Sequence, residues 1–155
     1  MKILKVGDNI WKFMQNNLNL SDEEMQIFRS NPRNERILSR MVPFTLDNII
    51  VIEVVKSHGC NSGHRKGTKF YFDGHGNLLT KYCPERICVF ALAQMNYKIF
   101  TIMEFVFAGI DPIELTFPRF SCPDVGLKND GWGQIIMEIK LDKLKNLRKS
   151  RKKNK

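Results

Sequence analysis

The apolar positions in the first 45 residues of the chain recur at the three- and four-residue spacing of amphipathic helices. Ser21 and Glu24 have the spacing of a capping box and predict that a helix starts just after Ser21. Pro32 fits the first position of a further helix, where its missing N–H costs nothing. We expect that helix to stop at Pro43. The pattern therefore predicts a helical N-terminal extension.

From residue 49 onward the apolar positions alternate with a period of two, which is typical of β-strands. Residues 49–55 are rich in β-branched side chains, and residues 134–141 alternate with their apolar members on one face. Residues 68–73 and 78–80 flank a Gly-His-Gly-Asn sequence at positions 74–77. Glycine and asparagine tolerate a positive φ, so we interpret these two segments as the arms of a hairpin.

A long apolar segment from Pro84 to Val106 lies between these strands and predicts one long helix that ends at Gly109. Apolar side chains occupy nearly its whole circumference, so we expect it to be enclosed on several sides. The predicted fold class is α+β, with a small mixed or antiparallel sheet packed on one long buried helix. We divide the chain into a helical N-terminal extension (1–45), a cysteine-containing α+β domain (46–142) and a basic tail (143–155).

The length of 155 residues and the hydrophobic content of 43% fit one globular domain with additional terminal segments. The net charge of +9 is not spread evenly, because residues 140–155 hold nine Lys or Arg and one acid. A run of like charges buries little surface, so we expect the segment from Lys143 to Lys155 to be disordered beyond about Leu147. It would solubilise the protein or make weak contacts with nucleic acid or an acidic protein.

The chain carries no sign of membrane insertion or export at the sequence level. No apolar stretch of signal-peptide length follows the first lysines, because Asp8, Asn9 and Lys12 come at once. The apolar segment over residues 87–110 is interrupted by polar side chains, among them Lys98. We therefore expect a cytoplasmic protein that does not contact membranes.

The four cysteines are the main candidates for chemistry, and in the cytoplasm they are expected to be thiols. Cys60, Cys83, Cys88 and Cys122 each fall at an irregular or terminal segment instead of inside an apolar run. If Pro84 is the first residue of the long helix, Cys83 is its N-cap, and both Cys83 and Cys88 lie near the positive end of the helix dipole. That position, with Arg86 nearby, favours their thiolate forms.

Three functions are compatible with these residues. The first is a metal-binding module in which the four cysteines, with His58 and His64 as further candidate ligands, hold a zinc ion or an iron–sulfur cluster. The second is a thiol-dependent redox protein or enzyme that uses Cys83 or Cys88. The third is a binding module whose basic tail engages RNA or an acidic partner. The cysteine spacing matches no common zinc-ribbon or ferredoxin pattern, and no hydrolase triad, phosphate-binding loop or zincin motif is present.

The motifs around the cysteines occur together over residues 49–141: Ser-His-Gly-Cys at 57–60, Cys-Pro-Glu-Arg-Ile-Cys at 83–88, Ser-Cys-Pro-Asp-Val-Gly at 121–126 and Gly-Trp-Gly at 131–133. This combination resembles a family of small bacterial and archaeal proteins, frequent in anaerobes, that has no assigned activity. The resemblance implies that the cysteine cluster is one unit, and it implies no substrate.

For Trp132 we expect an indole packed over the core.

Overall fold

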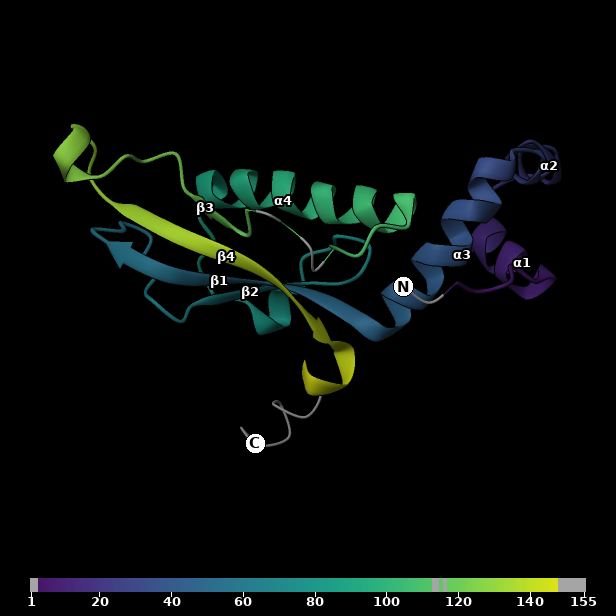
Figure 1. The fold of residues 1–155 in the computed structure, drawn as a ribbon, viewed down its shortest axis with the longest axis horizontal. Helices are drawn as coiled ribbons and strands as arrows, with labels where there is room; N and C mark the ends of the chain where they lie inside the picture. Colours follow the sequence, from purple (N-terminus) through teal and green to yellow (C-terminus); the bar gives the residue numbers. More distant parts are fainter. Residues whose placement is uncertain (1–2, 113–114, 116, 148–155) are drawn as a thin grey trace.

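The computed structural model describes residues 3–112, 115 and 117–147. It confirms the α+β class and shows a four-stranded antiparallel sheet in the order β2-β1-β4-β3 (Figure 1). Helix α4 lies along one face of this sheet, and α1 to α3 lie beyond one end of it (Figure 1). The helices and strands are α1 (Asp8–Leu18), α2 (Asp22–Ser30), α3 (Pro32–Asp47), β1 (Asn48–His58), β2 (Lys69–Phe72), α4 (Val89–Ala108), β3 (Arg119–Ser121) and β4 (Gln134–Lys143), with short 3-10 helices η1 (Thr80–Tyr82) and η3 (Leu127–Asn129).

The predicted start of α2 is confirmed, with both bonds of the capping box in place. The backbone N–H of Glu24 donates to Oγ of Ser21 at 3.2 Å, and the N–H of Ser21 donates to Oε2 of Glu24 at 2.7 Å. Pro32 opens α3, as predicted. The three N-terminal helices share a small core of their own, which consists of Val6, Trp11, Met14, Met25 and Leu38.

The prediction that α3 stops at Pro43 is wrong, because the helix continues to Asp47. A proline inside a helix leaves the carbonyl four residues earlier without its usual donor. Here that carbonyl belongs to Ser39, and it accepts instead from the backbone N–H of Leu4 at 2.8 Å. The following residue, Phe44, is buried in the main core. A bond from the N-terminal segment and core packing together sustain the last turn of α3.

The sheet follows the predicted alternation. Ile52 of β1 lies opposite Phe70 of β2 and Ile139 of β4, and all three side chains are buried on the face that α4 covers. The inward positions of β4 are Ile135, Met137 and Ile139, in agreement with the sequence pattern. Of the two arms of the predicted hairpin, only the first forms a strand, β2. The second arm makes a single β-bridge, from Leu78 to Phe72, and the chain then enters η1.

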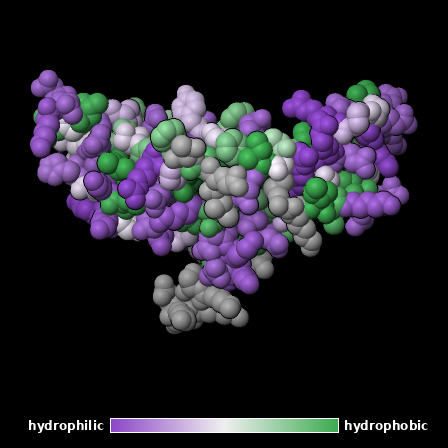
Figure 2. Space-filling model, viewed as in Figure 1, coloured by the Kyte–Doolittle hydropathy of each residue, from purple (hydrophilic) through white to green (hydrophobic). Residues whose placement is uncertain are grey.

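Helix α4 starts later than predicted and is less enclosed. Its N-cap is Cys88, not Cys83, and residues 84–88 are irregular, while Gly109 ends the helix with a φ of +83° as expected. Its inner side is buried, but Phe90 and Phe100 are 66% and 63% exposed. Green surface along the α4 side of the molecule marks apolar residues that reach solvent (Figure 2). The prediction of a helix enclosed on several sides is therefore wrong, since within the described residues the sheet covers one side and α3 contacts the C-terminal end, where Arg40 donates to the Phe107 carbonyl.

The C-terminal end of the described chain is part of the fold. Strand β4 runs to Lys143, and residues 144–147 form a helical turn. Leu147 is buried against Ile49 and Val51 on the sheet face opposite α4. The first five residues of the predicted tail are thus structured, and residues 148–155 lie outside the described residues. Over the part of the chain that is described, no helix is long and apolar enough to cross a bilayer.

Candidate functional site

Three of the four cysteines line one cavity of about 440 Å³. Cys60 follows the end of β1, Cys122 follows β3, and Cys88 caps the start of α4. Because β1 and β3 both run antiparallel to β4, which lies between them, the end of β1 lies beside the segment that joins β3 to β4. The first turn of α4 lies at the same end of the sheet (Figure 1). The topology therefore brings three sulfur-bearing segments, distant in sequence, to one place.

Cys88 has the environment of a stabilised thiolate. Burial raises the pKa of its thiol, but polar contacts with the Ala91 N–H, the Ser62 side chain and the Phe90 N–H outweigh burial and bring the pKa below the ordinary cysteine value. The Cys88 side chain makes no capping hydrogen bond. The two N–H groups therefore act on the sulfur through their partial positive charge at the N-terminal end of a 20-residue helix.

His64 lines both the cavity of Cys60, Cys88 and Cys122 and a neighbouring cavity of about 540 Å³. Its side chain is buried, and its ring meets Phe70 edge to face with centroids 5.1 Å apart. Its Nε2 accepts from the backbone N–H of Cys88 at 3.4 Å. Burial lowers the pKa of His64, so the ring is neutral near pH 7. This histidine orients the segment that carries Cys88.

Asp124 organises the loop between β3 and β4. Its Oδ1 accepts from the N–H groups of Gly126 at 3.0 Å and Trp132 at 3.1 Å, and its Oδ2 accepts from Gly133 at 3.0 Å. The N–H groups of Gly126 and Gly133, with a smaller effect from Trp132, hold the pKa of Asp124 below its usual range. In this hydrogen-bonded loop, Trp132 lines the cavity of Cys60, Cys88 and Cys122, and its side chain is 79% exposed. The prediction of an indole packed over the core is wrong.

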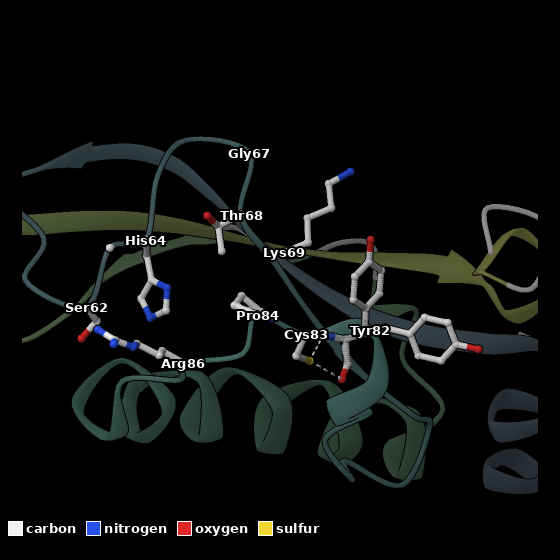
Figure 3. Close-up of a pocket in the computed structure, with 11 residues that line it drawn as sticks. Ser62, His64, Gly67, Thr68, Lys69, Tyr82, Cys83, Pro84 and Arg86 are labelled. Carbon is white, nitrogen blue, oxygen red and sulfur yellow. Dashed lines mark hydrogen bonds between the residues drawn. The ribbon is translucent and has the colours of Figure 1, made fainter. Parts of the chain in front are cut away.

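Cys83 lies apart from the other three cysteines, in a more open cavity of about 540 Å³. Its sulfur accepts from the Tyr71 N–H at 3.3 Å and its S–H donates to the Tyr71 carbonyl at 3.7 Å. Burial raises the pKa of this thiol, and the bond from the Tyr71 N–H only partly opposes that effect. In Figure 3, His64 and Arg86 lie toward one end of the cavity, while Cys83 and Tyr82 lie toward the other. The prediction of a lowered pKa for Cys83 is wrong, because α4 starts at Val89.

The remaining predicted ligand, His58, is exposed at the end of β1 and does not line either of these two cavities. The structure thus places His64 with Cys60, Cys88 and Cys122, and places His58 and Cys83 elsewhere. No group of three or more His, Cys, Asp or Glu side chains that could hold a metal ion is found among the described residues.

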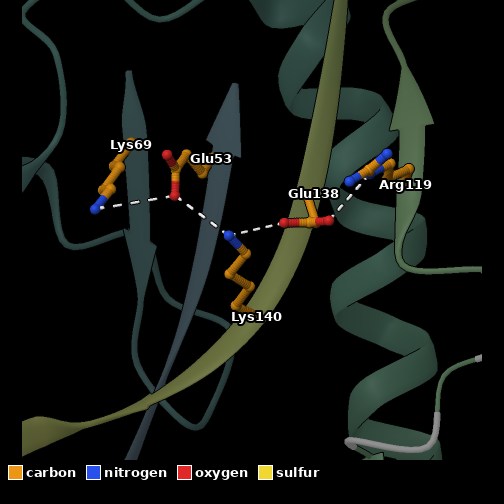
Figure 4. A network of polar contacts seen from close by, with 5 residues as sticks. All are labelled: Glu53, Lys69, Arg119, Glu138 and Lys140. Carbon is orange, nitrogen blue, oxygen red and sulfur yellow. Dashed lines mark hydrogen bonds and ion pairs between the residues drawn. The ribbon is translucent and has the colours of Figure 1, made fainter. Parts of the chain in front are cut away.

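The sheet face opposite α4 carries a chain of ion pairs that crosses all four strands (Figure 4). Lys140 lies 2.7 Å from Oε2 of Glu138 and 3.5 Å from Glu53, and Arg119 lies 3.0 Å from Oε1 of Glu138. The hydrogen bonds from Lys140 and Arg119 lower the pKa of Glu138. Each charge has an opposite partner within the sheet, which is the arrangement of a structural network, and such exposed pairs contribute about 0–1 kcal/mol each.

In comparisons with known protein families, curated proteins and solved structures, the chain matches none.

Proposed function

We propose that this protein is a thiol-dependent redox protein or enzyme whose reactive group is the Cys88 thiolate. The observation that supports this most is the position of Cys88: its sulfur is at the N-terminus of α4, in contact with Ser62, and it lines a cavity of about 440 Å³. The thiolate, not the thiol, is the nucleophile in cysteine chemistry. Small-molecule sites usually have volumes of about 300–1,000 Å³.

The activation of Cys88 does not depend on an imidazole base. Nε2 of the nearby His64 is occupied by the backbone N–H of Cys88, so that nitrogen does not take the thiol proton. The N–H groups of Phe90 and Ala91 and the Ser62 side chain stabilise the sulfur anion instead. This places Cys88 with the cysteines whose pKa is lowered by a helix N-terminus.

Cys60 and Cys122 supply the second thiol that a redox cycle needs. Both line the Cys88 cavity. Cys122 is held in place, because its sulfur accepts from the Ile135 N–H at 3.3 Å. A substrate disulfide would be the oxidant: the Cys88 thiolate would attack it and release one substrate thiol, and Cys60 or Cys122 would then attack the mixed disulfide, forming the protein disulfide and releasing the second substrate thiol.

The test is the rate of alkylation by iodoacetamide as a function of pH, read separately for each cysteine. Trypsin cleavage at lysine and arginine, including Arg86, places the four cysteines on four different peptides, so the unmodified protein can be used. We expect Cys88 to reach half its maximal rate below about pH 8.5, the value of a free thiol, and to react at pH 7 at least about tenfold faster than Cys83.

Cys83 is the matched control, because burial raises its pKa whereas that of Cys88 is lowered. Ser62→Ala is expected to move the Cys88 titration toward higher pH and to leave the Cys83 titration unchanged. A Cys88 rate that is half-maximal at or above about pH 8.5, or that is slower than the Cys83 rate, contradicts the proposal.

A second candidate function is a soft-metal site on the same cavity, holding a zinc ion or an iron–sulfur cluster. The observation that favours it is that Cys60, Cys88 and Cys122 line one cavity together with His64, since thiolate and imidazole are the ligands such metals prefer. Cys83 would not belong to this set.

For a metal site we expect about one zinc, or one cluster, per chain in protein purified without oxygen. Metal analysis before and after a chelator measures this. Removal of a bound metal should lower the stability and accelerate alkylation of Cys60, Cys88 and Cys122 together, with Cys83 unchanged. Protein without metal, whose stability is the same with and without chelator, would contradict a metal site and leave the thiol proposal intact.

A further inference from the structure

The outer side of α4 carries an uncovered row of side chains with the spacing of a helix–helix seam. Phe90, Ala93, Tyr97, Phe100 and Glu104 are all exposed and follow one another at intervals of three and four residues. A strict alternation of three and four is the heptad pattern by which one helix packs against another. Ala91, Met95, Ile99 and Ile102 already fill the inner side, so this row is not needed for the core of the monomer.

Two further exposed aromatic side chains lie near this row, one at the N-terminal end of α4 and one on the flank of the helix that carries Lys98, and together with the row they are called the patch. Trp132 lines the same cavity as Phe90, at the N-terminal end of the helix. Phe117 lies beside the middle of α4, since its carbonyl accepts from Nζ of Lys98 at 2.9 Å. The five aromatic residues of the patch are between 63% and 79% exposed; they are Phe90, Tyr97, Phe100, Phe117 and Trp132.

The size of this patch matches a protein interface. At about 200 Å² for each aromatic side chain, the five expose about 700 Å². The largest apolar patch on a typical monomer is about 300–600 Å², while each partner of a standard stable interface buries about 800 Å². The patch is thus large enough for most of one side of a dimer.

We propose that the patch is the interface of a homodimer in which two α4 helices pack antiparallel. The row of side chains is self-complementary in that orientation. With the two-fold axis near Met95, Phe90 meets Phe100 of the partner subunit and Ala93 meets Tyr97 of the partner subunit, so a small side chain faces a large one. Each contact occurs twice, and the seam extends for about 20 Å at 1.5 Å per residue.

Charge selects the antiparallel arrangement over the parallel one. Glu104 is the charged member of the row and lies near the C-terminal end of α4. In a parallel pair the two Glu104 carboxylates would face each other and the two helix dipoles would align. In the antiparallel pair the two Glu104 carboxylates lie at opposite ends of the seam, each near the level of the exposed Arg86 of the partner subunit, and the two helix dipoles oppose each other.

The test is the mass of the full chain in solution at tens of micromolar, measured by sedimentation or light scattering. We expect twice the 18.1 kDa of one chain. Phe100→Glu should raise the dimer dissociation constant at least about 100-fold, because it places a charge in the seam opposite Phe90 of the partner subunit, and it does so twice in the dimer. Phe13→Glu is the matched control: Phe13 is 61% exposed on α1, outside the patch, and its replacement should leave the dimer intact.

Circular dichroism establishes that each variant is folded, and Tyr97→Ser replaces Phe100→Glu if that variant does not fold. A monomer at these concentrations overturns the proposal, as does a dimer that Phe13→Glu dissociates and Phe100→Glu does not. Binding of monomers to neutral lipid vesicles through the patch would also overturn it. The measured mass does not depend on the reactivity of Cys88, so each proposal can fail without the other.

Discussion

Replacement of Phe70 by alanine is expected to lower the free energy of unfolding by about 3–5 kcal/mol. Phe70 is fully buried on β2, opposite Ile52 of the central strand, and it supports the ring of His64. Removal of the ring loses its transfer free energy and leaves a cavity between the sheet and α4, which the paired backbone of β1 and β2 cannot close. Equilibrium unfolding in urea measures the change, as a shift of the midpoint with an unchanged slope.

Phe13→Ala is the control for this experiment, because it deletes the same ring from a site that is 61% exposed. We expect it to change the stability by no more than about 0.5 kcal/mol. The Phe70 variant should also alter the alkylation rate of Cys88, since His64 loses the ring that holds it. A loss below about 1 kcal/mol for Phe70→Ala would show that β2 is not packed as the structure has it.

The features that sequence reasoning predicted correctly are those set by neighbouring residues. A strand buried on one face alternates along its own length, so Ile135, Met137 and Ile139 identify their face without any knowledge of what covers it. The capping box of Ser21 and Glu24 is likewise closed within a single turn. Such strands predicted a mixed or antiparallel sheet, and neither the choice between these two nor the strand order follows from the alternation.

The errors occur where a distant segment supplies a bonding partner. Pro43 is a stop signal only while the Ser39 carbonyl lacks a donor, and the donor comes from Leu4 at the other end of the N-terminal extension. Pro84 can begin the long helix only if Cys83 is available as its N-cap. Cys83 is instead bonded to the backbone of Tyr71 on β2, and the chain runs on to Cys88 before it turns into α4.

The candidate site shows the same division. The sequence predicts the placement of three cysteines at the ends of helices or strands, because each one follows or precedes a segment of strong apolar periodicity; they are Cys60, Cys88 and Cys122. The sequence carried no signal that Ser62 would act on the Cys88 sulfur, beyond its place in a glycine-rich turn. The exposure of Phe100 could not be predicted either, since an apolar face turned toward solvent and one turned toward the core have the same composition.

Replacement of Gly133 by alanine is expected to destabilise the cavity end of the sheet by about 3 kcal/mol. Gly133 is buried, and a Cβ added there would overlap the Gly59 carbonyl and come within 2.8 Å of the His58 oxygen. Gly59 is in turn held at a φ of +66°, and its own Cβ would lie 2.7 Å from the Trp132 oxygen. The two backbones touch where the end of β1 meets the loop before β4, so no side chain is available to move aside.

Gly63→Ala separates this overlap from the cost of a left-handed backbone. Gly63 has a φ of +77°, yet a Cβ there meets nothing within 4 Å, so we expect a loss of only about 1 kcal/mol, from conformation alone. Urea unfolding of both variants gives the difference, and the Gly133 variant should also change the alkylation rate of Cys88, because Gly59 and Gly133 line its cavity. Equal losses would mean that the contact between the two backbones relaxes at little cost and does not fix the shape of the cavity.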